Sequence, residues 1–328
     1  MGRGARLPRS RHLSGLVTGN PERAVECLRR GGLVGLPTET VYGLAADAAN
    51  SAAVARIFAV KGRPTDHPLI VHGADAGMLD GWAAPTGPAA DAYAELAATC
   101  WPGPLTLLVD RGPLVPDTVT GGRLTVGVRV PAHPVAIDVL TRFGTPIAAP
   151  SANRFGRVSP TTAEHVLADL GGLLDPARDC VLDGGRATVG VESTIVDLTV
   201  SPPQVLRAGA IDAATIARLL DTAVAEPAGP TRAAGMLAAH YAPDVEVLLA
   251  ESGTEAAAVA AARTSLGQRV QVLDRTADLV VAAHELYADL RAADTAGLDA
   301  LVVVLPPPTG LGLALRDRLT KAATGSTR

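Results

Sequence analysis

The sequence predicts an α/β fold, because short apolar segments alternate with longer stretches of helical spacing. Segments 33–36, 69–71 and 146–149 are apolar and stop at polar or Gly/Pro turns, as buried strands do. From residue 245 onward, three further apolar segments alternate with helical ones, which predicts a small parallel-sheet, Rossmann-like domain. The chain has 328 residues, 48% of them hydrophobic, so two domains with real cores are expected.

The predicted helices carry start and stop signals. The first begins near Pro21, with Asn20 as a candidate N-cap, and stops at a Gly-Gly pair. For a later helix, Ser159 is a candidate N-cap before a first-turn proline, while Thr161 with Glu164 fits a capping box. The other predicted helices are 51–60, 88–99 and 211–220, and the other predicted strands are 105–109, 124–130, 180–182, 193–198, 204–206, 245–249, 269–273 and 301–305.

Composition divides the chain into four parts. Residues 1–16 are basic and Gly-rich and are predicted to be a disordered tail. Residues 17–220 hold the first series of strands and helices, and residues 245–328 hold the second. Between them, residues 221–244 have the Ala, Pro, Gly and Thr content of a linker. Within the linker, 235–243 is too apolar and aromatic for a mere spacer.

Several classes of protein are disfavoured. The net charge of −4 provides no global field toward nucleic acid, so any RNA contact needs a local patch. The three cysteines are far apart without a CxxC pair, which indicates neither a zinc site nor a disulfide scaffold. The first twelve residues lack the apolar core of a secretory signal, and no apolar run reaches membrane-spanning length. We therefore expect a soluble cytoplasmic protein without a membrane partner.

The turn 61–72 concentrates charge between a predicted helix and a predicted strand. It contains Lys61, Arg63, His67 and His72, and Lys61 is one of only two lysines in the chain. One interpretation is a solvated charged loop, the usual fate of a charge run. The other is a site that needs an ammonium group. The turn by itself favours neither.

Phosphate-binding loops of the common kinds are absent, since the chain has neither GxxxxGK[ST] nor GxGxxG after a strand. A bound triphosphate would therefore depend on cationic side chains and a helix N-terminus. No G-x-S-x-G elbow surrounds Ser193, and no metal-site partners stand near His67 or His72. The candidate phosphate-binding residues are Lys61, Arg63, Arg129 and Arg207, with Ser151, Asn153 and Ser159 as hydrogen-bond donors.

Taken together, the motifs carry a family resemblance over residues 17–220. They are PTETVYGL (37–44), KGRPTDHPLIVH (61–72), WPGPLTLL (101–108), VGVRVPAHP (126–134), PIAAPSAN (146–153), VSPTTAEHV (158–166), LDGG (182–185), VGVESTIVDL (189–198) and LRAGAI (206–211). The chain resembles the YrdC-like threonylcarbamoyl-AMP synthases in their long, two-domain form. The segments GMLAAHYAP (235–243) and GLGLALRDRL (310–319) are similar to the linker and C-terminal domain of that form.

The resemblance implies a fold and a reaction. The implied fold is a YrdC-like twisted mixed sheet with flanking helices and a concave basic pocket, followed by a small Rossmann-like domain. The implied enzyme is a nucleotidyltransferase that joins L-threonine, bicarbonate and ATP into threonylcarbamoyl-AMP and releases pyrophosphate. Mg²⁺ would be held by the nucleotide phosphates rather than by a protein metal site. A transferase machinery would then pass the product to tRNA, which is also a candidate partner of this chain.

The resemblance also assigns residues. Lys61, Arg63, Ser151 and Asn153 fall on the catalytic K-x-R and S-x-N pairs. The implied ATP contacts are Lys61, Arg63, His67, Thr125, Ser151, Ser159, Arg207 and Tyr241. The implied threonine contacts are Thr38, His72, Arg129, Ala149 and Ser193, with Arg129 clamping the carboxylate through two hydrogen bonds and Tyr241 closing over the nucleotide as part of a lid.

Two other functions remain open at this level. The same fold could hold double-stranded RNA or tRNA without catalysis, through its local cations and its basic tail. Carbamoyl-adenylate chemistry, as in hydrogenase maturation, is a third interpretation, but the cysteine motifs and the acylphosphatase-like extension of those proteins are missing.

Overall fold

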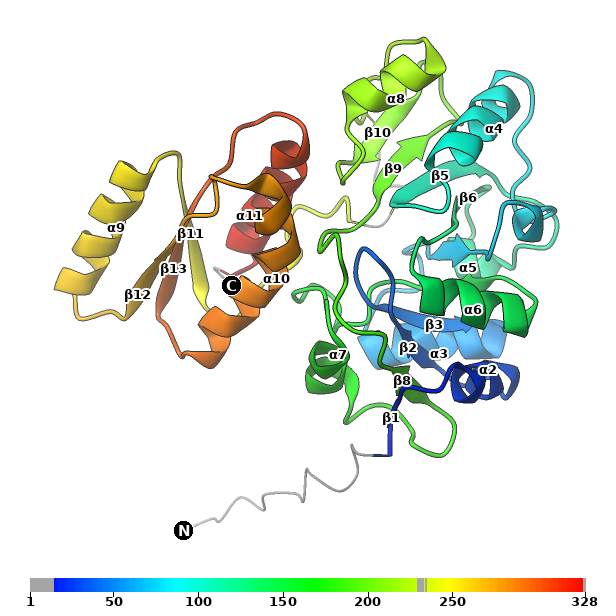
Figure 1. Ribbon diagram of the computed structural model, residues 1–328, viewed down its shortest axis with the longest axis horizontal. Helices are drawn as coiled ribbons and strands as arrows, with labels where there is room; N and C mark the ends of the chain where they lie inside the picture. The colour runs from blue at the N-terminus through cyan, green and yellow to red at the C-terminus, as the bar shows by residue number, and fades with distance from the viewer. Residues whose placement is uncertain (1–14, 229–232, 234, 327–328) are drawn as a thin grey trace.

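The computed structural model describes residues 15–228, 233 and 235–326, which form two α/β bodies (Figure 1). Residues 1–14 of the expected tail lie outside the described residues. The tail prediction extends too far, because Leu16 is fully buried and its carbonyl accepts a hydrogen bond from Val181.

The larger body is built on one mixed sheet. Its strand order is β1-β8-β2-β3-β7-β4-β6-β5-β9-β10. The pairs β1/β8, β2/β8, β4/β6 and β5/β9 are parallel and the remaining pairs are antiparallel. The strands are β1 (Val17–Thr18), β2 (Val34–Leu36), β3 (Gly43–Asp47), β4 (Ile70–His72), β5 (Leu105–Asp110), β6 (Thr125–Arg129), β7 (Ile147–Ala148), β8 (Cys180–Leu182), β9 (Thr194–Asp197) and β10 (Gln204–Arg207).

Helices cover both faces of this sheet, and alternate strand residues face opposite layers. Cys180 and Leu182 pack in the cluster that contains α2 and α6, whereas Val181 packs in the cluster that contains α3, α4 and α7. The apolar strands are therefore buried on both sides, which is why they read as continuous apolar runs. The helices of this body are α2 (Pro21–Arg29), α3 (Ser51–Lys61), α4 (Pro88–Cys100), α5 (Asp117–Thr120), α6 (Pro134–Phe143), α7 (Ala163–Leu170) and α8 (Ala213–Leu220), with a 3₁₀ turn at Gly77–Leu79.

The helix ends explain most boundaries. Asn20 caps α2 as expected, and Gly62 ends α3 in the left-handed conformation with φ 65°. Both predicted starts for α7 were wrong by one or more residues, because Thr162 is the N-cap and accepts a hydrogen bond from the His165 amide. The hydroxyl of Ser159 has a different partner, described below. The sequence analysis also did not propose β3, α5 or α6.

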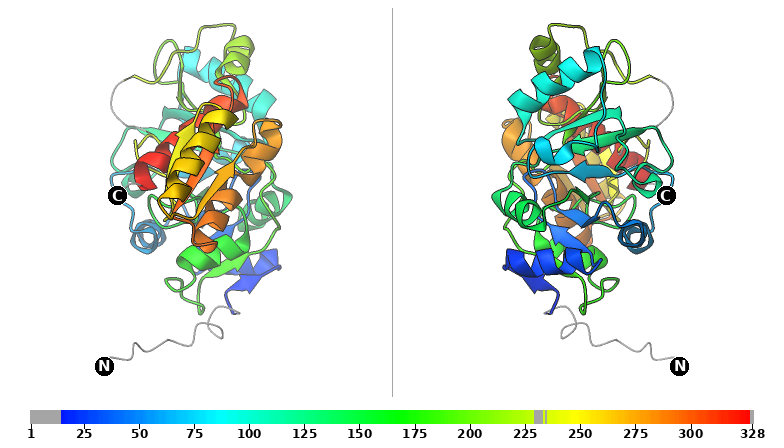
Figure 2. Two further views of the ribbon diagram at one scale, coloured as in Figure 1. Left: turned by 90° about the vertical axis from the view of Figure 1, so that its left-hand side faces the viewer. Right: turned by 90° about the vertical axis from the view of Figure 1, so that its right-hand side faces the viewer.

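The smaller body contains a parallel three-stranded sheet of order β11-β13-β12, in agreement with the Rossmann-like prediction. Figure 2 shows α9 on the side of this sheet that faces away from the larger body. Helices α10 and α11 lie on the other side, against the larger body (Figure 1). The elements are β11 (Glu246–Ala250), α9 (Gly253–Ser265), β12 (Val270–Leu273), α10 (Leu279–Thr295), β13 (Ala300–Val304) and α11 (Leu311–Ser326).

The two bodies share an apolar cluster. It joins Val41, Val158 and Val191 of the larger body to residues of α10 and α11, and Tyr241 lies within it. Ion pairs such as Arg291–Asp169, 2.7 Å, flank the cluster. The domain limits at 220 and 245 stay predictions, but α8 ends at Leu220 and β11 begins at Glu246, so this interval connects the two bodies.

Within the described residues, none of the helices combines the length and the apolar character needed to cross a membrane.

Candidate functional site

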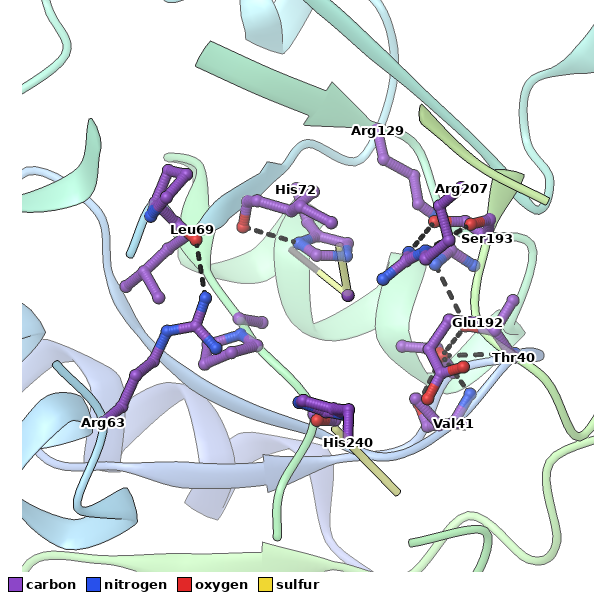
Figure 3. Close-up of a pocket in the computed structure, with 18 of the residues that line it drawn as sticks. Thr40, Val41, Arg63, Leu69, His72, Arg129, Glu192, Ser193, Arg207 and His240 are labelled. Carbon is purple, nitrogen blue, oxygen red and sulfur yellow. Dashed lines mark hydrogen bonds between the residues drawn. The ribbon is translucent and has the colours of Figure 1, made fainter. Parts of the chain in front are cut away.

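A hollow lies where strands of the large sheet end beneath the connecting segment (Figure 3). Its walls come from the loop before β3, the ends of β4 and β6, the loop after β7, the residues that lead into β9, and the connecting segment itself. Among the residues singled out in the sequence, those that line it are Thr38, Arg63, His72, Arg129, Ala149, Ser151, Ser193, Arg207 and Tyr241.

Adjacent parallel strands place His72 and Arg129 side by side. The two residues are register partners at the carboxyl ends of β4 and β6, where α/β sheets bind ligands. His72 Nδ1 lies 3.2 Å from the Ile70 carbonyl, and burial followed by the charge of Arg129 lowers the His72 pKa to about 3. His72 is therefore a neutral imidazole at physiological pH.

Arg129 already has partners. It donates to Glu39 Oε1 at 2.5 Å through Nη2, to Thr40 Oγ1 at 3.0 Å through Nη1, and to the Gly103 carbonyl at 3.1 Å through Nε. Of the five N–H groups of a guanidinium, two remain. The expected two-bond carboxylate clamp is thus restricted to those two, on a side chain that Glu39 fixes in place.

A second arginine lines the hollow from β10. Arg207 donates to the carbonyl of Ser193 from Nε and to its hydroxyl from Nη2, both at 2.9 Å. Ser193 Oγ also lies 2.8 Å from Thr106 Oγ1. This agrees with the interpretation of Ser193 as a hydrogen-bonding hydroxyl rather than an activated nucleophile. Burial lowers the Arg207 pKa, yet arginine stays charged in proteins.

The 61–72 turn is a built site rather than a solvated loop. Lys61 is fully buried, and its Nζ donates to the carbonyls of Ser151 at 2.6 Å and Asn153 at 2.5 Å. Burial, then the charge of Arg63, lowers the Lys61 pKa well below its ordinary value. Lys61 does not line the hollow; it fastens α3 to the loop after β7, and so positions Ser151.

Arg63 turns the other way, toward the hollow (Figure 3). Its Nη2 donates to the Pro68 carbonyl at 3.0 Å, and its guanidinium carbon lies 5.7 Å from the Phe155 ring centroid, a cation–π distance. Burial lowers the Arg63 pKa to about 10, which leaves the group charged at neutral pH.

The connecting segment covers the hollow with two aromatic residues, His240 and Tyr241. Tyr241 has φ 61°, a left-handed backbone that is strained for a bulky residue. Its ring is fixed on three sides, 4.2 Å from the His240 ring, 5.6 Å from the Tyr287 ring and 5.4 Å from the Arg318 guanidinium carbon. Burial lowers the His240 pKa to about 3, so this imidazole is neutral.

Glu192 is a functional-site residue that the sequence analysis did not single out. It lines the hollow and is buried, and its oxygens accept from Ser159 Oγ at 2.6 Å, Tyr287 OH at 2.7 Å and Arg318 Nε at 2.9 Å. Burial opposes ionisation, but the charges of Arg318 and Arg207 lower the Glu192 pKa to about 2. The available signal was a glutamate that directly follows the apolar Val189-Gly190-Val191 segment and precedes Ser193.

Four further expected residues stand behind or beside the walls. Ser159 and Asn153 are buried; the Asn153 amide donates to the carbonyls of residues 154 and 157. His67 packs its ring edge-on against Phe155, 5.4 Å away. Thr125 begins β6, at the opposite end of that strand from Arg129. None of the four is among the residues that line the hollow.

The described residues contain no group of three or more His, Cys, Asp or Glu side chains that could hold a metal ion. The hollow instead gathers three guanidinium groups and several hydroxyls around one space. Such a surface is suited to a ligand with both carboxylate and phosphate groups.

Two family models match most of the chain. The family model for Sua5, YciO and YrdC, described as telomere recombination, matches residues 26–209. The model for the C-terminal domain of threonylcarbamoyl-AMP synthase matches residues 211–324.

Individual relatives cover nearly the whole chain. Threonylcarbamoyl-AMP synthase of Pyrococcus abyssi is 39% identical over 90% of this chain and 92% of its own length. The enzyme of the same name from Bacillus subtilis is 38% identical over 94% and 95%. The crystal structure of P. abyssi Sua5 complexed with L-threonine superposes with a TM-score of 0.85 at 35% identity, covering 98% of this chain and 96% of that one.

Proposed function

We propose that this chain, which belongs to the Sua5–YciO–YrdC family, is an L-threonylcarbamoyladenylate synthase. It joins L-threonine, bicarbonate and ATP into threonylcarbamoyl-AMP and pyrophosphate, and it is in class a nucleotidyltransferase. The observation that carries the proposal is the single hollow shared by Arg63, Arg129, Arg207, Ser151 and Ser193 in a chain with full-length relatives of that name.

Threonine occupies the end of the hollow formed by β4 and β6. The free N–H groups of Arg129 take its carboxylate, while Thr38, His72, Ala149 and Ser193 surround the rest. Support comes from the burial of His72 as a neutral group and from the fixed orientation of Arg129. The L-threonine complex of P. abyssi Sua5 has the same fold.

ATP occupies the end formed by the cationic turn and β10. Arg63 and Arg207 face its phosphates, and Tyr241 covers it. Of the other residues that the family resemblance assigns to ATP, Ser151 lines the hollow, whereas Lys61, His67, Thr125 and Ser159 do not. Lys61 and Ser159 support the wall from behind. Mg²⁺ would accompany the nucleotide and would supply charge neutralisation at its phosphates.

The chemistry requires positioning more than a covalent catalyst. The threonine amine and bicarbonate give a carbamate and water. A carbamate oxygen then forms a bond to the α-phosphorus of ATP as the bond from that phosphorus to the pyrophosphate oxygen breaks. Arg63 and Arg207 stabilise charge on the transferring group and on pyrophosphate. Because water decomposes a carbamate, His240 and Tyr241 exclude it by covering the hollow.

The product is an activated acyl donor, so a separate transferase machinery and a tRNA acceptor follow this enzyme, in the cytoplasm. Purified protein given ATP, bicarbonate and Mg²⁺ is expected to release pyrophosphate only when L-threonine is added, with threonylcarbamoyl-AMP detected by mass spectrometry. Serine and valine serve as controls for the amino acid. Release at the same rate without threonine, or RNA binding without ATP turnover, would contradict the proposal.

A further inference from the structure

The hollow contains a negative charge where an anion is expected to bind. Glu192 lines the wall next to Ser193, the residue that holds Arg207. With a pKa near 2 it is ionised at physiological pH. An unbalanced carboxylate there would repel phosphates and compete with them for Arg207, whose charge already helps to keep Glu192 ionised.

Two side chains of the smaller body donate hydrogen bonds to Glu192. Arg318 on α11 donates to Oε2 through Nε at 2.9 Å, and Tyr287 on α10 donates to the same oxygen at 2.7 Å. Arg318 has no exposed surface, although it lies 126 residues along the chain from Glu192. The smaller body therefore reaches into the wall of the site instead of only packing against it.

Stability alone is a weak reason for this pair. Two buried ions lose their hydration, and an apolar pair of similar volume often holds two surfaces together as well. Arg318 Nη2 is also buried without a hydrogen-bond partner among the described residues, a further cost. The Tyr241 ring, which lines the hollow, lies over the same guanidinium.

We propose that Arg318 is a positioning residue for nucleotide binding: it neutralises Glu192, so that this carboxylate neither repels the phosphates of ATP nor competes with them for Arg207. The C-terminal domain thereby sets the charge of the nucleotide site from behind its wall. This inference rests on the proposed function and assigns a role to a residue outside the catalytic sheet.

The first test is Arg318→Met in the full-length protein. Once Arg318 is removed, the Glu192 carboxylate keeps its charge, attracts Arg207 and repels phosphate. The dissociation constant of MgATP, measured by calorimetry, is therefore expected to rise about tenfold or more. The dissociation constant of L-threonine is expected to change less than about threefold, because Arg129 is held by Glu39 and not by Glu192.

The second variant removes both charges. In Glu192→Gln/Arg318→Met the net charge of the pair is unchanged, and MgATP affinity is expected to return to within about threefold of wild type. Arg318→Lys keeps the charge and is expected to bind MgATP within about threefold of wild type as well. This variant tests the inference even if Arg318→Met does not fold.

Two matched control variants distinguish the loss of the charge beside Glu192 from a general loss of contacts between the two bodies. Arg316→Met makes the same change on the same helix, where the partner is the exposed Glu251. Arg186→Met removes a different ion pair between the two bodies, that with Glu285 at 2.7 Å. Both are expected to bind MgATP as wild type does.

Three results would overturn the inference: a double variant as weak as Arg318→Met, a tenfold loss in Arg318→Lys, or equal losses for ATP and threonine. Each would show that Arg318 acts through packing. A failure of the proposed function would look different, since the wild-type protein itself would then release no threonine-dependent pyrophosphate.

Discussion

Each of two buried ion pairs at the hollow joins a glutamate to an arginine, but a different member of the pair faces the ligand space in each. In Glu39–Arg129, 2.5 Å, the carboxylate stands behind and holds an arginine that faces the ligand space. In Glu192–Arg318, 2.9 Å, the carboxylate faces the space and the arginine stands behind. The first pair lies within the larger body and the second joins both bodies. The role of a buried ion pair in this site therefore depends on which of its two members faces the ligand space.

Lys61 provides the largest expected effect, because it is a buried cation that forms no ion pair with a carboxylate of the described residues. Its Nζ is held by two carbonyls of the loop after β7. Lys61→Ala removes this support and leaves the carbonyls unpaired, so kcat/KM for pyrophosphate release is expected to fall roughly 100-fold. Thermal unfolding of the variant serves as the control for folding. Turnover near wild type would remove Lys61 from the mechanism.

The Glu39–Arg129 pair is broken by Glu39→Gln. The amide keeps the shape but loses the charge that fixes Arg129, so the KM for L-threonine is expected to rise about tenfold while the KM for ATP changes less than about threefold. This is the reverse of the pattern expected for Arg318→Met. If Glu39→Gln raised the KM for ATP more than the KM for L-threonine, the two ion pairs would not act on separate substrates.

The stability of the protein is expected to depend on pH, because several buried histidines stay neutral in the folded chain. Burial lowers the pKa of His72 and His240 to about 3 and of His165 to about 4, from an ordinary value of 6.5. Below pH 6.5 the unfolded chain therefore binds protons that the folded chain does not. Stability is expected to fall as the pH drops from 6.5 toward 4, by about 1 kcal/mol per histidine at pH 5.5.

The measurement is urea unfolding at pH 7.5 and at pH 5.5, with His72→Asn as the matched variant. The variant is expected to lose less stability between the two pH values than wild type does, by the share of one histidine. An identical difference in both proteins would mean that His72 is protonated in the folded state.

The smallest effect is expected at an exposed pair. Arg157–Asp244, 2.6 Å, joins the loop after β7 to the end of the connecting segment, but the Asp244 side chain is 79% exposed. Solvent screens such a pair, so Arg157→Ala is expected to change kcat less than about twofold and stability by less than about 1 kcal/mol. A tenfold loss of activity would show that this exposed contact, and not only the buried pairs, holds the cover over the hollow.

Local chemistry in the sequence was enough for much of the fold. The caps and the Gly62 stop depend on neighbouring residues, and the apolar strands are buried on both faces. These features identified α2, α3 and the small parallel sheet. The spacing signals were too weak for β3, whose Gly-Leu-Ala-Ala run has little strand propensity, and for the four-residue α5.

The candidate site divides in the same way. The motifs indicated Arg63, Arg129, Ser193 and Arg207, and with the family resemblance they indicated the activity. The sequence could not decide which cation faces the ligand, since Lys61 and Arg63 are two residues apart and point to different partners. Nor could it join Glu192 to Arg318. The sequence determines residue types and their local spacing. The net charge at the wall of the hollow depends on tertiary structure, because folding places the distant Arg318 behind Glu192.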